Sequence, residues 1–73
     1  MRVRIDRTTT SLAVQELCVL QLLARGYTTR QIAQLVGELP DAVEGLIASA
    51  TRQLGVSTRA EAVAAALQCG LIV

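Results

Sequence analysis

The side chains of this sequence that could carry chemistry are mainly arginines and carboxylates. The chain has seven basic residues, six acidic residues and no histidine. It has neither a clustered pair of acids nor a glycine-rich phosphate loop, so we expect no enzyme, no catalytic residue and no cofactor. Cys18 and Cys69 lack the spacing of a zinc or redox motif, and no metal site is predicted. We expect both thiols to be inert, with a Cys69 disulfide across a dimer as the alternative.

Phosphate binding is the chemistry that remains open, and its best candidates stand together at the start of a predicted helix. These candidates are Thr28, Thr29, Arg30 and Gln31. Hydroxyls, guanidinium groups and helix N-termini all bind phosphate. Thr28 and Gln31 also match a capping box, in which their side chains satisfy free backbone N–H groups, so Thr28 is primarily a helix cap. Arg52, near the end of the next helix, is a further phosphate candidate, with a solvated surface position as the alternative.

The next predicted helix begins with negative charge. Asp41 and Glu44 lie near its start, and no basic residue follows before Arg52. Carboxylates there favour the helix dipole, but each costs about 1 kcal/mol against a close phosphate even in water-like surroundings. The two acids therefore either only stabilise the helix, or indicate avoidance of DNA and attraction to a basic partner. Glu44 can nevertheless accept a hydrogen bond from cytosine N4.

Neighbouring residues on this helix suggest a surface for contact with protein. Gly45 has no side chain and lowers helix propensity by about 1 kcal/mol relative to alanine. Leu46 and Ile47 follow Val43 by three and four residues, so we expect one of them in the core and the other exposed. An exposed apolar residue beside acids suits a protein contact. The predicted protein-contact residues are Asp41, Glu44, Leu46 and Ile47.

Hydrophobic spacing and helix-stop signals predict four helices. Their expected ranges are about 13–25, 28–36, 40–54 and 58–69, each followed closely by a glycine. The residues assigned to their apolar faces are Val19, Leu20, Leu23 and Ala24; Ile32, Leu35 and Val36; Val43, Leu46, Ile47, Ala50 and Leu54; and Val63 and Ala66. Thr58 and Glu61 form a second capping box. The prediction is an all-α, four-helix domain over residues 12–73.

An N-terminal arm, residues 1–11, precedes this domain and alternates polar and apolar residues at its start. It holds three of the seven arginines, and it either lies along a phosphate backbone or is a mobile, solvated terminus. The net charge of +1 argues against strong non-specific DNA binding, although not against a local basic patch. No signal peptide is visible, and the longest apolar run, 62–67, is too short to cross a bilayer. A cytoplasmic chain with no membrane contact is expected.

A set of residues spread over 12–72 recurs in the order and spacing of a known domain pattern, without a gap. The set includes Leu12, Glu16, Val19, Leu20, Gly26, Thr28, Ile32, Ala33, Val36, Val43, Leu54, Gly55, Val56, Arg59, Glu61, Ala62, Val63, Gly70, Leu71 and Ile72. Through these residues the sequence resembles the LuxR/GerE family of bacterial-type helix-turn-helix regulators. The resemblance implies a DNA-binding module of a transcription regulator, whose third helix enters the major groove. The DNA-binding candidates that it implies are Thr28, Thr29, Arg30, Gln31, Glu44, Gly45 and Arg52.

The sequence departs from the family mainly at the start of the third helix. Leu39 replaces the usual Ser or Thr cap, Ala42 replaces a threonine, and Glu44 stands where basic and polar residues are favoured. Two functions therefore stay open. The chain is either a DNA-binding transcription regulator acting as a homodimer, or a degenerate helix-turn-helix that docks on, or forms mixed dimers with, another regulator. No small-molecule ligand is expected.

The predicted fourth helix carries a candidate dimer surface. The candidate residues, which recur at three- and four-residue steps, are Thr58, Glu61, Ala65 and Cys69. The resemblance supports this assignment, because the fourth helix of the family often pairs with a second copy. The alternative is an alanine-rich surface without a partner.

Overall fold

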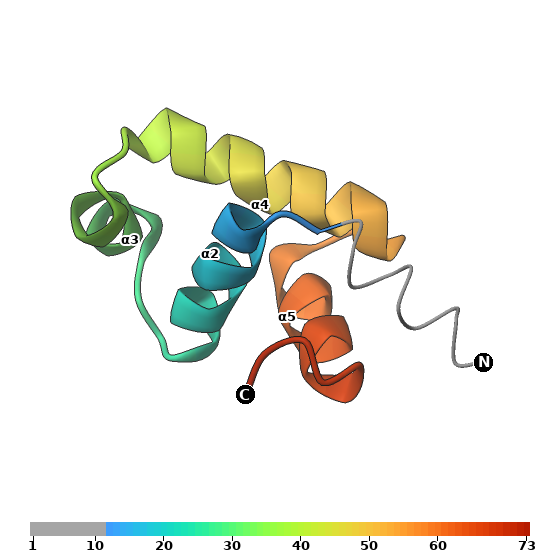
Figure 1. Ribbon diagram of the computed structural model, residues 1–73. Helices are drawn as coiled ribbons and strands as arrows, with labels where there is room; N and C mark the ends of the chain where they lie inside the picture. Colours follow the sequence, from blue (N-terminus) through green and yellow to red (C-terminus); the bar gives the residue numbers. More distant parts are fainter. Residues whose placement is uncertain (1–11) are drawn as a thin grey trace.

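Four helices joined by short turns account for most of residues 12–73, the part of the protein that the computed structural model describes. They are α2 (Val14–Ala24), α3 (Thr29–Val36), α4 (Pro40–Leu54) and α5 (Arg59–Gln68) (Figure 1). The all-α prediction is confirmed, and no helix end differs from its predicted position by more than one residue. The predicted arm, residues 1–11, lies outside the described residues. No helix within residues 12–73 is long and apolar enough to span a membrane.

Local side-chain signals set the ends of these helices. Thr28 Oγ1 accepts a hydrogen bond from the backbone N–H of Gln31 at 3.1 Å, and the Gln31 side chain accepts one from the backbone N–H of Thr28 at 2.9 Å. Thr58 and Glu61 make the same reciprocal pair before α5. Both predicted capping boxes are therefore confirmed. Gly37 ends α3 in the left-handed conformation, at φ 74°, which costs glycine little.

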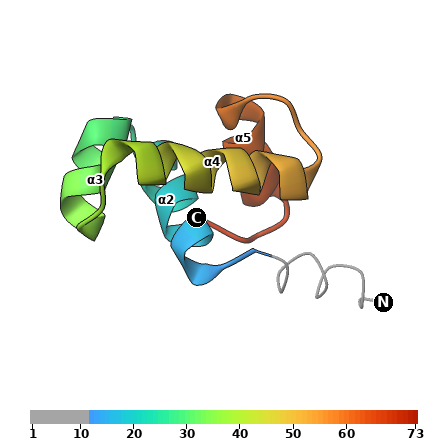
Figure 2. The ribbon, with the colours of Figure 1, turned by 90° about the horizontal axis from the view of Figure 1, so that it is seen from above.

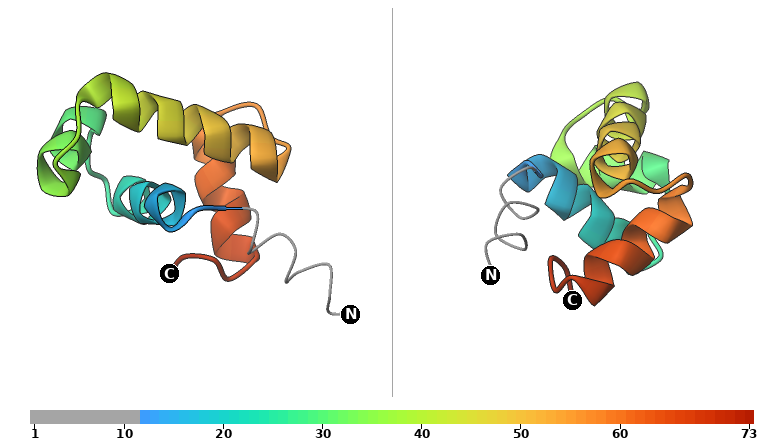
Figure 3. Two further views of the ribbon diagram at one scale, coloured as in Figure 1. Left: turned by 45° about the horizontal axis from the view of Figure 1, so that its top comes forward. Right: turned by 90° about the vertical axis from the view of Figure 1, so that its right-hand side faces the viewer.

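The longest helix, α4, lies across α2 and α5, and α3 lies beside its N-terminal end (Figures 1 and 2). Further views show α2 and α5 on the same side of α4, so that the opposite side of α4 is left uncovered by residues 12–73 (Figure 3). The long helix α4 thus packs against the other three helices with one side and exposes its other side. This arrangement decides which side chains of α4 can meet a partner.

The core consists of two clusters that share α2 and α4. One lies between α2, α4 and α5 and contains Leu12, Leu20, Ala50, Ala62, Ala66 and Ile72. The other lies between α2, α3 and α4 and contains Val19, Ile32, Ala33, Val43 and Ile47. Consecutive residues of α2, Val19 and Leu20, thus serve different clusters. Because the fully buried residues that α5 supplies to its cluster are alanines, its backbone can approach the other helices closely.

Some residues predicted to face the core are exposed. Leu35 and Val36 are 59% and 38% exposed, and Ala33 takes their place beside Ile32. The reason is that α3 lies at one end of the bundle, so that only its middle packs against other helices (Figure 1). Ala24, the last residue of α2, is also exposed. Periodicity identified which residues share a helix face, but it did not show where the neighbouring helix ends.

Glu16 is a buried carboxylate with a structural role. It is 4% exposed, and its Oε1 atom accepts a hydrogen bond from the backbone N–H of Ala13 at 2.9 Å. Gln53 on α4 donates to its Oε2 atom at 3.2 Å. Glu16 therefore caps α2, where the side chain of Ala13 cannot, and it connects α2 to α4. Such pairing offsets the cost of burying a charge.

Candidate nucleic-acid interface

The uncovered side of α4 is lined mainly by small residues. The exposed residues along it are Asp41, Ala42, Gly45, Ala48 and Arg52. Because three of these five have no side chain beyond a methyl group, the backbone of α4 can approach a partner surface closely. The charges stand at the two ends, with Asp41 in the first turn and Arg52 in the last.

A network of hydrogen bonds and one ion pair lies beside this side of α4. Nη2 of Arg59 donates to Oε1 of Glu44 at 2.7 Å, and Nη1 of Arg59 donates to Oγ1 of Thr29 at 3.1 Å. The Thr29 hydroxyl in turn donates to Oε2 of Glu44 at 2.8 Å. Thr29 begins α3 and Arg59 begins α5. The network therefore holds the N-termini of both helices against the first half of α4.

This network changes the electrostatic meaning of Glu44. The side chains of Arg59 and Glu44 are 48% and 46% exposed, so both groups remain open to solvent. An anion near Glu44 therefore meets a carboxylate and a guanidinium together. The repulsion expected from an isolated acid, about 1 kcal/mol per close phosphate, is largely offset. The N-termini of α3 and α5 add partial positive charge to the same region.

The pKa of Glu44 lies below its ordinary value of 4.5. The main cause is the hydrogen bond from Thr29, and the hydrogen bond and positive charge of Arg59 act in the same direction, against partial desolvation. These partners favour the ionised form of the group. Glu44 is accordingly a carboxylate at neutral pH, with acceptor capacity and no proton to donate.

Stability at acid pH should depend on this carboxylate. Because the folded-state pKa is lowered, the contribution of Glu44 is fully present above the ordinary value of 4.5 and is lost as the pH falls through the folded-state pKa. The contribution is small, below about 1 kcal/mol, because the pair is half exposed. Urea unfolding between about pH 6 and about pH 3 should show a steeper acid loss for the natural chain than for Glu44→Gln. Parallel curves would contradict the assignment.

The other predicted phosphate-binding residues occupy two parts of this surface. Thr28 and Gln31 are exposed and engaged in the cap of α3, while Arg30 is exposed beside them. Arg52 is exposed in the last turn of α4. The structure brings Thr29 and Glu44 into direct contact and leaves Arg52 about two turns of α4 beyond Glu44.

Sequence reasoning did not assign a site role to Arg59. In the sequence it was only one of the residues that match the family. The missing information is spatial, since Arg59 and Glu44 are 15 residues apart and sit on different helices. An exposed arginine at the start of a helix was the available signal, because a cation at that end opposes the helix dipole. An arginine at such a position is therefore expected to pair with an acidic side chain from another part of the fold.

The candidate dimer residues lie along α5, and half of them already have a role. Thr58 and Glu61 are exposed but make the cap of α5. Ala65 is half-buried, and Cys69 is exposed just after the helix. Both Cys18 and Cys69 are free thiols.

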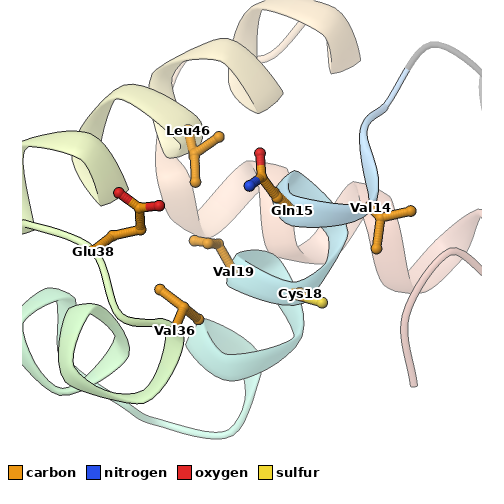
Figure 4. Close-up of a pocket in the computed structure, with 7 residues that line it drawn as sticks. All are labelled: Val14, Gln15, Cys18, Val19, Val36, Glu38 and Leu46. Carbon is orange, nitrogen blue, oxygen red and sulfur yellow. The ribbon is translucent and has the colours of Figure 1, made fainter.

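The predicted protein-contact residues separate into different environments. Ile47 is 4% exposed and packs in the core, so the prediction that it contacts another protein is wrong. Leu46 is half-buried and lines an apolar groove of about 160 Å³ between α2, the end of α3 and α4 (Figure 4). The residues that line this apolar groove are Val14, Gln15, Cys18, Val19, Val36, Glu38 and Leu46. Glu44 and Leu46 are two positions apart on a helix and therefore lie on opposite flanks of α4.

Comparison with known proteins identifies the family. Among curated proteins, no sequence matches the chain. A solved structure described as that of the transcription factor GerE is similar to it, with 31% sequence identity and a TM-score of 0.82. That similarity covers 85% of this chain and 92% of the other. Residues 10–66 match the model of the bacterial regulatory proteins of the luxR family. The chain therefore belongs to the luxR family of bacterial regulatory proteins, with the helix-turn-helix fold of a DNA-binding transcription regulator.

Proposed function

We propose that the protein regulates transcription by binding duplex DNA as a homodimer, with α4 in the major groove. Membership of the luxR family supports DNA binding and transcription regulation in general. The observation specific to this chain is the contact between Arg59 and Glu44, which offsets the acid on the helix that would enter the groove. The acidic start of α4, by itself an argument against DNA, is thereby compatible with a phosphate-rich partner.

The distribution of donors supports a particular orientation on DNA. In a helix-turn-helix the first helix crosses the phosphate backbone, and the second places its N-terminal residues at the base edges. Here these helices are α3 and α4. Arg30 and Thr29 at the start of α3, with Arg59 at the start of α5, would contact phosphates beside the groove. Arg52 would reach the backbone from the far end of α4.

Dimerisation would use the exposed surface of α5. A single recognition helix covers only a few base pairs, and two-fold dimers in this class bind paired half-sites. The surface for pairing would include the predicted residues Glu61, Ala65 and Cys69, of which Glu61 and Cys69 are exposed and Ala65 is half-buried. The small side chain of Ala65 would let the helix backbones of two copies approach closely.

A titration of labelled random-sequence duplex at two salt concentrations tests the proposal. Binding should weaken steeply as salt rises, because phosphate contacts release counterions. Gel filtration should show that the free protein is a dimer. It should also show that the complex contains two chains per duplex. If no duplex is bound even at low salt, the proposal is wrong.

The apolar groove favours a second candidate function, in which the domain docks on another regulator. The groove combines the exposed side chains of Val14 and Val36 with the half-buried Leu46, and Glu38 stands beside them (Figure 4). A partner with an apolar side chain next to a basic group would suit it. Leu46→Glu should then abolish capture of that regulator, while Leu35→Glu, a matched change outside the groove, should not. Equal capture by both variants would contradict this function.

A further inference from the structure

We propose that Glu44 is the specificity-determining residue of α4 and that it recognises a cytosine in the major groove. The proposal rests on the proposed function, since it assumes that α4 enters DNA. It goes beyond that function by naming both the base and the atom that recognises it. The recognising group is the Glu44 carboxylate, which accepts a hydrogen bond from the exocyclic N4 amine.

The composition of α4 leaves few other ways to recognise a base. The N-terminal residues of such a helix are those that contact base edges. In the first nine residues of α4, from Pro40 to Ala48, only Asp41 and Glu44 have polar side chains. Hydrogen-bonded base recognition by this segment therefore depends on a carboxylate.

The surroundings distinguish Glu44 from Asp41. Each oxygen of Glu44 accepts one hydrogen bond, Oε1 from Arg59 and Oε2 from Thr29. An ionised carboxylate oxygen can accept two, so each retains capacity for one more donor. The two fixed partners also restrict the rotation of the side chain. Asp41, in contrast, makes no hydrogen bond to another side chain within residues 12–73, and no arginine there offsets its charge.

Access to the carboxylate is open from the uncovered side of α4. Glu44 is 46% exposed, and its neighbour Gly45 has open space where a Cβ atom would lie. Ala48, one turn further on, is also exposed and small. A base edge can therefore come close to the helix without meeting a bulky side chain.

The chemistry of the base edges favours cytosine over adenine. Both bases present an exocyclic amine in the major groove, but adenine places the N7 acceptor next to it. That lone pair would repel a carboxylate, whereas cytosine has no acceptor at the corresponding place. The guanine of the same base pair presents O6 and N7, which are acceptors. Neither of these is a partner for a carboxylate, so Glu44 can recognise this base pair only through the cytosine amine.

Selection of binding sites from a random duplex pool tests the proposal. The natural chain should enrich sites with cytosine at one fixed position of each half-site, preferred by about fivefold or more. Glu44→Gln should move the preference at that position from cytosine to adenine, because an amide can pair with both N6 and N7. Glu44→Ala should lose the preference there. Asp41→Asn removes the same charge from the same helix and should keep the cytosine.

The outcomes separate this proposal from the proposed function. If the natural chain binds duplex but Glu44→Gln and Glu44→Ala enrich the same site as the natural chain, Glu44 does not determine specificity and only the present inference fails. Binding without any enriched sequence would also overturn the inference alone. If no duplex is retained at all, the proposed function fails with it. Circular dichroism of each variant checks that the helices are intact.

Discussion

Replacing Arg59 with alanine should weaken binding to a random-sequence duplex by about tenfold. Two effects add to this loss. The guanidinium is removed from the surface that would meet phosphates, and Glu44 becomes a half-exposed acid without its ion-pair partner. The second effect alone corresponds to about 1 kcal/mol, or fivefold, for a close phosphate. Duplex titration over a range of salt should also show that the slope of log affinity against log salt falls by about one.

A double variant separates the two effects. Arg59→Ala combined with Glu44→Ala should bind random duplex about fivefold more tightly than Arg59→Ala alone, since the uncompensated carboxylate is gone. Arg25→Ala is the matched control, because Arg25 follows α2 at the end that points away from α4 (Figure 1). It removes the same charge and should change affinity by less than about twofold, since screening weakens distant charges. Equal effects of Arg25→Ala and Arg59→Ala would mean that net charge alone governs affinity.

Leu20→Ala should remove most of the free energy of unfolding, so that a large fraction of the molecules is unfolded. Leu20 is fully buried at the contact of α2, α4 and α5, where three of its buried neighbours, Ala50, Ala62 and Ala66, have side chains too small to fill the space. Truncating a buried leucine to alanine costs about 2–5 kcal/mol. A single core in a chain of this size rarely supplies more than about 3–5 kcal/mol. The substitution therefore removes most of the stability, which urea unfolding at neutral pH would measure.

Leu35→Ala provides the comparison for this effect. Leu35 is 59% exposed at the end of α3, although its spacing had placed it on the apolar face. The same chemical change there should alter the free energy of unfolding by less than about 0.5 kcal/mol. A loss at Leu35 as large as that at Leu20 would show that α3 is covered by something that residues 12–73 do not include.

Features of the fold that depend on neighbouring residues could be predicted from the sequence. The caps at Thr28 and Thr58 each follow from a pattern of four residues, and the glycine after α3 follows from backbone conformation alone. The family, too, was identifiable, because many weak matches stand in order along the chain. These signals need no knowledge of how the helices cross.

The decisive contact of the candidate site could not be predicted in this way. Thr29, Glu44 and Arg59 are separated by 15 residues at each step, and only the crossing of α3, α4 and α5 brings them together. Taken alone, Glu44 allowed two interpretations, stabilisation of the helix start or avoidance of DNA, and the sequence offered no means of finding its partner. The exposure of Leu35 has the same origin, since it depends on where α3 lies beside its neighbours.

The sharing of α4 between the two clusters of the core has a consequence for the thermodynamics of recognition. Val43 and Ile47 belong to one cluster and Ala50 to the other, so α4 cannot loosen without exposing both. The conformational entropy lost in ordering this helix is therefore already lost when the chain folds. A partner meets a rigid surface whose backbone needs no rearrangement, and its association resembles the docking of preformed bodies. Little of the binding free energy is then spent on ordering the backbone of the recognition helix.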